Sequence, residues 1–332
     1  MRHLAEQDKT MSDPQSLQFE IPPHLAGQRL DQALAELLPD YSRARLQLWI
    51  KAGKVQIDGE TRRPRDKLRG GEQVAVQAEN EAQVTWEAED IPLDIVYEDE
   101  SIIVINKPAG MVVHPATGNY TGTLVNALLH HDASLEEVPR AGIIHRLDKD
   151  TSGLLVVART LVAHNSLIKQ LQARTVKREY EAVVTGLMTA GGTVKTAMGR
   201  HPVHRTRMAV LTRGGKEAVT HYRVLERYRA HTHIRVRLET GRTHQIRVHM
   251  AHIRYPLVGD PVYGGRLRLP PQSSEVLTET LRHFNRQALH AAQLGFDHPQ
   301  NGQPVEWSAP LPADMRHLLT VLAEDLAEHA DA

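Results

Sequence analysis

Five ionisable side chains stand between two apolar runs near the middle of the chain. Within AGIIHRLDKDTSGLLVVART, residues 141–160, the segment between GII and LLVVA contains His145, Arg146, Asp148, Lys149 and Asp150. Short apolar runs of this kind are typical of buried strands. Because unpaired charge is costly to bury, charges placed here belong either to a solvated turn or to a reaction centre. The rest of the sequence has to decide between the two.

Length and composition narrow the class of protein. The chain has 332 residues, enough for two domains, and 24% of them are charged, as in ordinary globular proteins. It has no cysteine, which excludes disulfides, cysteine nucleophiles and thiolate zinc sites, and no GxxxxGK[ST] phosphate loop. The N-terminal residues lack the apolar core of a signal peptide, and no run approaches the ~18 apolar residues of a membrane span. We therefore expect a cytoplasmic protein without membrane association.

Opposite charges are concentrated in different parts of the chain, although the formal net charge is zero. Residues 41–70 contain nine Lys/Arg against three Asp/Glu, and residues 171–254 contain seventeen against five. Residues 81–100 contain eight Asp/Glu and no Lys/Arg. Segregated charge produces local basic surfaces, which are the electrostatic footprint of polyanion binding. The sequence therefore favours a nucleic-acid partner in spite of its neutrality.

Residues 18–80 predict a small α+β unit. RLDQALAELL places its apolar residues on one helical face, and the following helix, RARLQLWIKA, is expected to begin after Ser42 and to end at Gly53. KVQID and EQVAVQA alternate like strands, and Asp58-Gly59 predicts a turn between strand-like pieces.

This unit resembles the S4 RNA-binding module in its RLDQAL and SRARLQLWIKAGKVQIDG stretches. The resemblance implies that RNA is bound by the basic residues of the second helix and its exit, namely Arg43, Arg45, Lys51 and Lys54. We expect residues 1–17 to be a disordered tail and residues 81–95 to be an acidic linker. A catalytic domain is expected over residues 96–325.

Asp148 is the most informative charged residue in that second domain. A carboxylate in a partly apolar pocket is pushed towards its neutral form, and a nearby arginine reverses this effect. An arginine from LETGRTHQIRVHMAHIRYPLVGD, residues 238–260, would thus give an anionic nucleophile or base without metal or cofactor. The same residues fit a structural ion pair, which composition alone favours.

A family resemblance changes this balance. HRLDKDTSGLLVVA resembles the central motif of the RluA family of RNA pseudouridine synthases. NKPAGMVVHP, KREYEAVVTG, GRTHQIRVHMAHIRYPLVGDPVYG and LHAAQLGFDHP resemble its other motifs in family order, and the match spans residues 91–322. The resemblance implies an α+β catalytic domain with a mixed, mainly antiparallel sheet and a central cleft. It also implies isomerisation of uridine to pseudouridine without a cofactor.

The resemblance assigns roles to individual residues. Asp148 would be the catalytic aspartate and Arg247 its ion-pair partner. Tyr180 would pack against the target base, and Arg146 would enter the helical space that the flipped uridine leaves. Further substrate contacts are expected from Arg242, His145 and Lys107. Whether the aspartate adds to the sugar or removes a sugar proton to give a glycal stays open.

The longer strings VVHPATGNYTGTLVNALLHH, VPRAGIIHRLDKDTSGL and HPVHRTRMAV resemble the subgroup that modifies the helix 69 stem-loop of large-subunit (23S) ribosomal RNA. We therefore expect a monomer that acts on this RNA, free or within the assembling subunit. One alternative is a synthase of the same family acting on other ribosomal or transfer RNA uridines. Another is a non-catalytic S4-type RNA-binding or ribosome-assembly protein.

Twenty histidines make a metal site an alternative to consider. His231 and His233 share a strand face, and His249 and His252 are three residues apart. No glutamate stands in HExxH spacing with them, and no thiol is available. The sequence therefore predicts no metal site.

Overall fold

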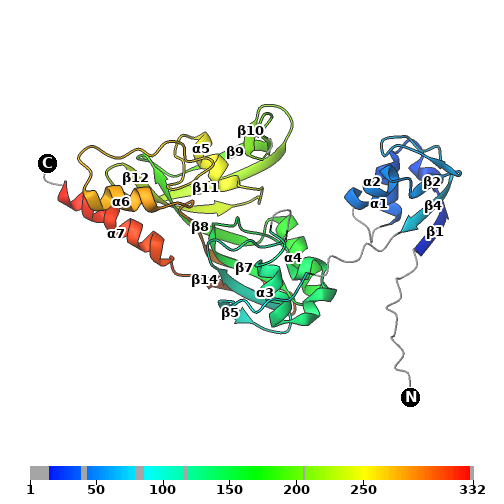
Figure 1. Ribbon diagram of the computed structural model, residues 1–332, viewed down its shortest axis with the longest axis horizontal. Helices are drawn as coiled ribbons and strands as arrows, with labels where there is room; N and C mark the ends of the chain where they lie inside the picture. The colour runs from blue at the N-terminus through cyan, green and yellow to red at the C-terminus, as the bar shows by residue number, and fades with distance from the viewer. Residues whose placement is uncertain (1–14, 39–42, 79–85, 116–118, 205, 330–332) are drawn as a thin grey trace, which may run out of the picture. The chain divides into compact units, whose positions relative to one another are not determined.

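The computed structural model divides into two compact units, residues 1–85 and 86–332 (Figure 1). It describes residues 15–38, 43–78, 86–115, 119–204, 206–329. Each unit has a hydrophobic core of its own.

The first unit is a four-stranded sheet, in the order β1-β4-β2-β3, with two α-helices. All of its strand pairs are antiparallel. Its elements are β1 (Gln15–Glu20), η1 (Pro23–Leu25), α1 (Leu30–Leu37), α2 (Arg43–Lys51), β2 (Val55–Ile57), β3 (Glu60–Thr61) and β4 (Gln73–Ala78).

Local sequence signals predicted most of this unit. The apolar face of α1 is buried through Leu30, Ala33 and Leu34. Gly53 has the positive φ of +75° that ends α2, and Asp58-Gly59 forms the tight turn between β2 and β3. Ser42, the expected N-cap, and residues 1–14 of the expected tail lie outside the described residues. The tail prediction was wrong for residues 15–17, which pair with β4 as the start of β1.

The second unit contains one large sheet flanked by helices. Its strands are β5 (Ile95–Glu98), β6 (Ile102–Lys107), β7 (Ser152–Ala158), β8 (Lys177–Thr185), β9 (Gly192–Arg200), β10 (Met208–Leu211), β11 (Lys216–Arg227), β12 (His231–Leu238), β13 (Leu289–Asp297) and β14 (Pro304–Ser308). Its helices are α3 (Leu124–His131), η2 (Ala133–Glu137), η3 (Pro139–Gly142), α4 (Leu161–Ala173), α5 (Gln245–His252), α6 (Glu275–His283) and α7 (Ala313–Glu328). None of the helices in the described residues is long and apolar enough to cross a bilayer.

The sheet runs in the order β10-β9-β11-β12-β8-β13-β7-β6-β5, with β14 beside β13. Every pair is antiparallel except β13 with β7, so the expected mixed, mainly antiparallel sheet is confirmed. Strand β13 joins the two halves of the sheet, which are β10-β9-β11-β12-β8 and β7-β6-β5. Strand β8 pairs with one edge of β13, while β7 and β14 pair with its other edge. The segment that carries Asp148 enters the sheet at this junction, just before β7.

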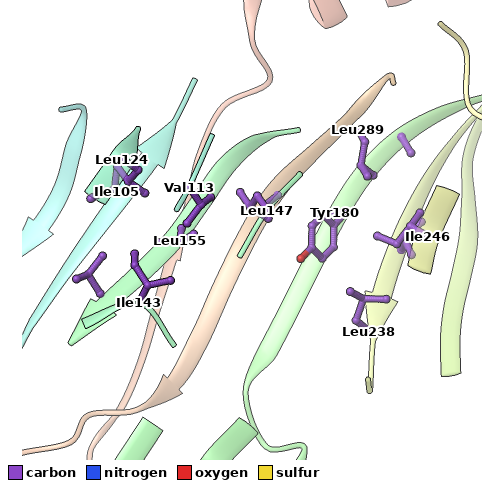
Figure 2. Packing of buried hydrophobic residues seen from close by; sticks show 14 of the residues in the cluster. Ile105, Val113, Leu124, Ile143, Leu147, Leu155, Tyr180, Leu238, Ile246 and Leu289 are labelled. Carbon is purple, nitrogen blue, oxygen red and sulfur yellow. The ribbon is translucent and has the colours of Figure 1, made fainter. Parts of the chain in front are cut away.

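Both faces of β7 are covered, and all seven of its residues are buried. One face joins the largest apolar cluster, which spans both halves of the sheet and includes Leu147, Leu155, Tyr180, Ile246 and Leu289 (Figure 2). The other face packs on α4. The charged segment before β7 is therefore anchored by apolar residues at both ends. Of the two apolar runs expected as strands, only LLVVA forms one, as part of β7, whereas GII begins at the last residue of η3 and makes a single bridge between Ile143 and Val157.

The acidic linker prediction was wrong for residues 86–95. Trp86 packs against the large apolar cluster, and Glu89 accepts hydrogen bonds from the backbone of Gly122. Asn126 donates to the carbonyl of Glu87 at 2.8 Å. These long-range contacts join the segment to the second unit, whereas residues 81–85 lie outside the described part. The unit also ends later than predicted, because α7 continues to Glu328.

Gly153 permits the close approach of β7 to β13. Its φ is +111°, and a Cβ there would lie 2.3 Å from the carbonyl oxygen of Ala291. Gly153→Ala should therefore lower the free energy of unfolding of the second unit by about 3 kcal/mol or more, as measured by denaturant titration. Gly302→Ala is the control, because Gly302 also has a positive φ of +69° but open space around it. The control should cost about 1 kcal/mol, and equal losses for both variants would contradict the steric argument.

Candidate active site

A cavity of about 960 Å³ opens beside the junction of β7, β8 and β13. It brings together segments that are far apart in the sequence: residues 140–148, the end of α4, β8, and residues 238–247. Asp148 and Tyr180 both line it, as do four further residues named from the sequence: His145, Arg146, Arg242 and Arg247. The expected central cleft is present.

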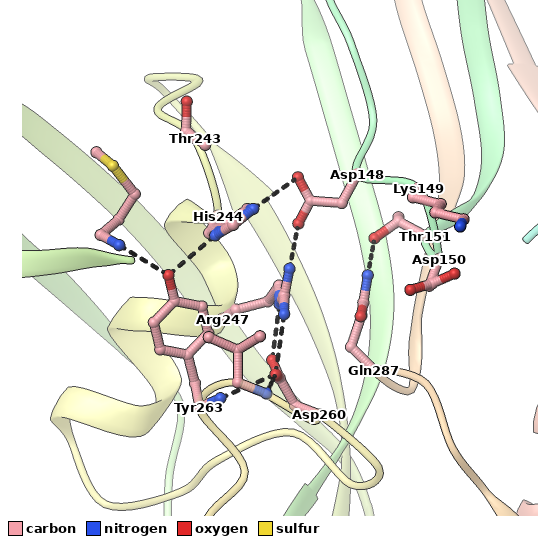
Figure 3. Close-up of polar contacts among 12 residues, drawn as sticks. Asp148, Lys149, Asp150, Thr151, Thr243, His244, Arg247, Asp260, Tyr263 and Gln287 are labelled. Atoms are coloured by element: carbon pink, nitrogen blue, oxygen red, sulfur yellow. Dashed lines mark hydrogen bonds and ion pairs between the residues drawn. The ribbon is translucent and has the colours of Figure 1, made fainter. Parts of the chain in front are cut away.

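Asp148 is held in a chain of ion pairs (Figure 3). Its Oδ2 accepts a hydrogen bond from Nη1 of Arg247 at 2.9 Å, across 99 residues of sequence. The same guanidinium donates from Nε and Nη2 to the two carboxylate oxygens of Asp260, at 2.7 and 2.9 Å. The planar guanidinium thus bridges two carboxylates, one completely buried and one 24% exposed to the cavity.

Asp260 holds this arginine from the buried side. Burial alone would raise the pKa of Asp260, but the hydrogen bonds and charge of Arg247 outweigh it, helped by the backbone N–H groups of Tyr263 and Val262. The pKa of Asp260 therefore lies below its usual value. The face of Arg247 is also covered by the ring of Tyr263, whose centroid is 5.1 Å from the guanidinium carbon.

The GRTHQ turn before α5 aims Arg247 at Asp148. The buried amide of Gln245 donates to Val219 O and Thr220 Oγ1 on β11, and its oxygen accepts from Thr240 and Arg242. All hydrogen-bonding positions of this amide are used, which fixes the first turn of the helix. Arg247 follows two residues later on the same turn.

The loop that carries Asp148 is held by its backbone. The ammonium of Lys107 is fully buried and donates to three carbonyl oxygens, those of Pro108, Met111 and Lys149. Burial lowers the pKa of Lys107 to about 8, although the charges of Asp150 and Asp148 oppose this shift.

Lys107 is not among the residues that line the cavity. In this structure it therefore positions the loop and makes no contact with the space where a substrate would bind. Arg286 and Gln287 add hydrogen bonds to Asp150 O and Thr151 Oγ1.

His244 is a second polar neighbour of Asp148 that sequence reasoning did not single out. Its Nε2 lies 3.9 Å from Asp148 Oδ1, and its Nδ1 lies 2.9 Å from the hydroxyl of Tyr263. That hydroxyl also accepts from the backbone N–H of Met208, and if it donates its own proton to Nδ1, the ring proton stands on Nε2, which faces Asp148. Burial lowers the pKa of His244, opposed by Asp148, so the ring is neutral.

Tyr180 and His145 form the less polar wall of the cavity. Tyr180 is 7% exposed, and burial raises the pKa of its phenol. His145 Nε2 accepts from the backbone N–H of Val156 at 3.3 Å, and burial, followed by the charge of Arg178, lowers its pKa to about 3. Both side chains are therefore neutral at physiological pH.

The basic residues predicted from the sequence fall into different environments. Arg146 is exposed and donates to Thr243 Oγ1 at 3.2 Å, and Arg242 donates to the carbonyl of Glu217 at 3.0 Å. In the S4 unit, Lys51 is exposed at the end of α2, and Lys54 lies just beyond it. The side chains of Arg43 and Arg45 lie outside the described residues.

Sequence reasoning also missed Asp260, Tyr263 and Gln245, which hold Arg247 in place. All three stand within the GRTHQIRVHMAHIRYPLVGDPVYG string that carries Arg247. Asp260 stands 13 residues after Arg247, and this nearby carboxylate was the available signal. A spacing of 13 residues does not correspond to neighbouring positions on one helix or strand, so it does not predict a contact. Only the fold of the intervening chain shows which acid pairs with which arginine.

This arrangement can support chemistry on a neutral ring without a metal ion. A carboxylate oriented by an arginine can act as a nucleophile or as a base. The phenol of Tyr180 provides an apolar surface with a polar tip, as stacking against a base requires. A base stacked inside a duplex is not accessible to a group in such a cavity, so a nucleotide from a helical stem would have to leave the stack to enter it.

Comparisons with known proteins show which family the chain resembles. Residues 101–252 match the family model described as RNA pseudouridylate synthase, and residues 28–74 match the S4 domain model. The chain is 60% identical to a ribosomal large subunit pseudouridine synthase D of Pseudomonas aeruginosa, over 95% of this chain and 98% of that protein. A relative of the same name from Escherichia coli is 59% identical, over 92% and 94% of the two chains.

Solved structures give the same assignment for the fold. Human RNA pseudouridylate synthase domain containing 4 is 26% identical, with a TM-score of 0.53 over 69% of this chain and 92% of that one. Human RNA pseudouridylate synthase domain containing 1 is also 26% identical, with a TM-score of 0.52 over 67% and 85%. The chain belongs to the RNA pseudouridylate synthase family. It is an isomerase that forms pseudouridine and carries an N-terminal S4 domain, as its sequence predicted.

Asp260→Asn tests how Arg247 is held. The change removes a buried charge that pairs with the guanidinium, so it should lower the free energy of unfolding by about 3–5 kcal/mol. Arg247 would then be free to rotate away from Asp148, and kcat should fall by about 100-fold. Denaturant titration and tritium release from C5-labelled uridine in RNA measure the two effects.

The pH dependence gives an independent check on Asp260. Because its pKa is lower in the folded than in the unfolded state, its contribution to stability is complete above about pH 4 and is lost at lower pH. Asp260→Asn should therefore flatten the loss of stability on the acid side. The exposed Asp297 is the control, and Asp297→Asn should leave the acid profile and kcat unchanged. An unchanged acid profile in Asp260→Asn would contradict the ion-pair argument.

Proposed function

We propose that this enzyme converts specific uridines of large-subunit (23S) ribosomal RNA to pseudouridine, and that its targets lie in the helix 69 stem-loop. The observation that carries the ribosomal substrate is the identity of 60% over nearly the whole length with a large-subunit synthase. The helix 69 target rests on the three longer strings shared with that subgroup. A monomeric cytoplasmic enzyme fits this role.

Asp148 is the proposed catalytic residue. The reaction breaks the bond from uracil N1 to the ribose, turns the base and forms a bond from C5 to the same ribose carbon. The proton on C5 is lost to solvent and N1 gains a proton, so the redox state does not change. Asp148 either adds to the sugar or removes a sugar proton, and Arg247 holds its carboxylate in position at 2.9 Å. Tyr180 supports the base as it turns within the cavity.

The uridine has to leave its helix to reach this carboxylate. Extrusion costs a few kcal/mol of stacking and pairing, and a side chain that fills the gap offsets part of that cost. Arg146 is exposed at the rim of the cavity, where it donates to the hydroxyl of Thr243 at 3.2 Å and has no carboxylate partner among the described residues. We therefore assign it the role of entering the vacated space.

Two other functions fit part of the sequence. A synthase of the same family acting on other ribosomal or transfer RNA uridines would need the same site with different RNA contacts. A non-catalytic RNA-binding protein would not need a carboxylate, an arginine and a tyrosine assembled beside a cavity. The assembled site therefore favours catalysis.

Asp148→Asn tests the catalytic role. The amide is nearly isosteric with the carboxylate but is neither a nucleophile nor a base, so turnover should be abolished while RNA affinity changes little. Tritium release from C5-labelled RNA measures turnover, and filter binding measures affinity. Retention of a tenth of the wild-type activity would disprove the role of Asp148.

Mapping of pseudouridines in ribosomal RNA from a strain without this protein tests the target. The helix 69 positions should be uridine in that strain, should be restored by the wild-type gene, and should stay unmodified with the Asp148→Asn gene. Loss of pseudouridine at other sites, with helix 69 unaffected, would overturn the proposed target but not the activity.

Deletion of residues 1–80 tests the S4 domain. The two units have separate cores, so the remaining chain should keep its fold. RNA binding should weaken, and its dependence on salt should become less steep, because the lost lysines and arginines neutralise phosphates. Turnover should survive at high RNA concentration. Complete loss of turnover by a folded fragment would show that the domain does more than bind RNA.

A further inference from the structure

Arg178 is a buried cation on the wall of the cavity that the proposed reaction does not use. It stands on β8 two residues before Tyr180, which puts both side chains on the same face of the strand about 7 Å apart. The residue is 7% exposed and lines the cavity.

The guanidinium of Arg178 has almost no partner. Its Nε is buried without a hydrogen bond, and its Nη2 makes one long contact of 3.4 Å, with the carbonyl of Glu239. The carboxylate of Glu239 is directed elsewhere, to His221 at 2.6 Å and to Arg174 at 3.4 Å. Within the part of the chain that the structure describes, no carboxylate pairs with Arg178.

The neighbouring backbone leaves room for this side chain. Gly241 has no positive φ that would call for glycine, but a Cβ there would lie 2.7 Å from Nη1 of Arg178. The glycine thus lets the turn before α5 pass directly beside the guanidinium. A glycine costs backbone entropy on folding, because it is the most flexible residue in the unfolded chain. Room for the guanidinium of Arg178 is a reason for a glycine at this position.

A buried guanidinium without a counter-ion destabilises a protein unless a ligand supplies the missing charge. The bases of RNA are neutral, and its anionic groups are phosphates. Guanidinium and phosphate match in geometry through two parallel hydrogen bonds. The cavity that holds Asp148 and Tyr180 continues to Arg178, so a nucleotide in it would bring a backbone phosphate near.

From these observations we infer that Arg178 forms a phosphate subsite inside the active-site cavity, which binds one backbone phosphate next to the flipped uridine. The phosphate supplies the counter-ion that the free protein lacks. Binding there fixes the depth to which the nucleotide enters, and so places the ribose at Asp148. The inference rests on the cavity being the uridine site, and not on the helix 69 target.

A methylphosphonate scan tests the subsite. Short RNAs that contain a uridine the enzyme is known to modify carry one neutral methylphosphonate at each flanking position in turn. A methylphosphonate at one of these positions should lower kcat/KM of the wild-type enzyme by about 10- to 100-fold. The kcat/KM of Arg178→Met on RNA with only ordinary phosphates should be lower than that of the wild-type enzyme by a similar factor. A methylphosphonate at that position should not lower the kcat/KM of this variant any further. Equal penalties in both enzymes at every position would overturn the inference.

Arg235→Met is a matched control. Arg235 also has a buried Nε without a partner, but it lies on the opposite face of the sheet and pairs with Glu181 at 2.6 Å. This variant should melt at a lower temperature than wild type yet keep the full methylphosphonate penalty. The melting temperature of free Arg178→Met should equal or exceed that of wild type, because an unpaired buried charge is removed. A fall as large as that of Arg235→Met, or failure to fold, would make Arg178 structural and overturn the inference.

Gly241→Ala offers a second route to the same result. It keeps the charge of Arg178 but pushes Nη1 out of place, so it should reduce the methylphosphonate penalty at the same position. An unchanged penalty would show that the phosphate does not meet this guanidinium. Because the RNA is chosen from mapped targets, failure of the helix 69 proposal leaves the test intact.

Discussion

The active site depends on one guanidinium that bridges two carboxylates. Arg247 donates two hydrogen bonds to the buried Asp260 and one to Asp148 at the edge of the cavity. Because the buried carboxylate takes the bidentate contact, the arginine is fixed in orientation before any substrate arrives. An N–H of its Nη1 then defines where the carboxylate of Asp148 lies. A preorganised carboxylate of this kind needs no metal ion to position it.

The fold supplies what this bridge requires. Asp148 lies on a loop anchored by Leu147 on one side and by buried β7 on the other, and Lys107 holds the carbonyls of that loop. Arg247 lies on α5, whose first turn is locked to β11 through Gln245. The two segments meet because β8 and β13 lie between them in one continuous sheet. The carboxylate of Asp148 is therefore held rigidly beside the cavity into which we propose that the uridine enters.

Charge in the cavity is divided between paired and unpaired groups. Arg247 is fully engaged by protein carboxylates, and the histidines nearby are neutral because burial lowers their pKa values. Arg178 in contrast has no anionic partner among the described residues, and Arg146 at the rim contacts only a hydroxyl. The paired cation orients the carboxylate of Asp148, while Arg178 and Arg146 have no carboxylate partner among the described residues, which is why we propose that they contact RNA.

The sequence alone determined features that depend on neighbours in the chain. Helix faces, the stop at Gly53, the turn at Asp58-Gly59 and the strand that follows HRLD result from local periodicity and backbone freedom. The family resemblance supplied the pair of Asp148 with Arg247 across 99 residues. Tertiary structure decided the rest: that residues 86–95 pack on the second unit, that Lys107 holds the loop of Asp148 without lining the cavity itself, and that Arg178 has no carboxylate partner among the described residues. Each of these depends on which distant groups surround a side chain, and local patterns carry no information about such contacts.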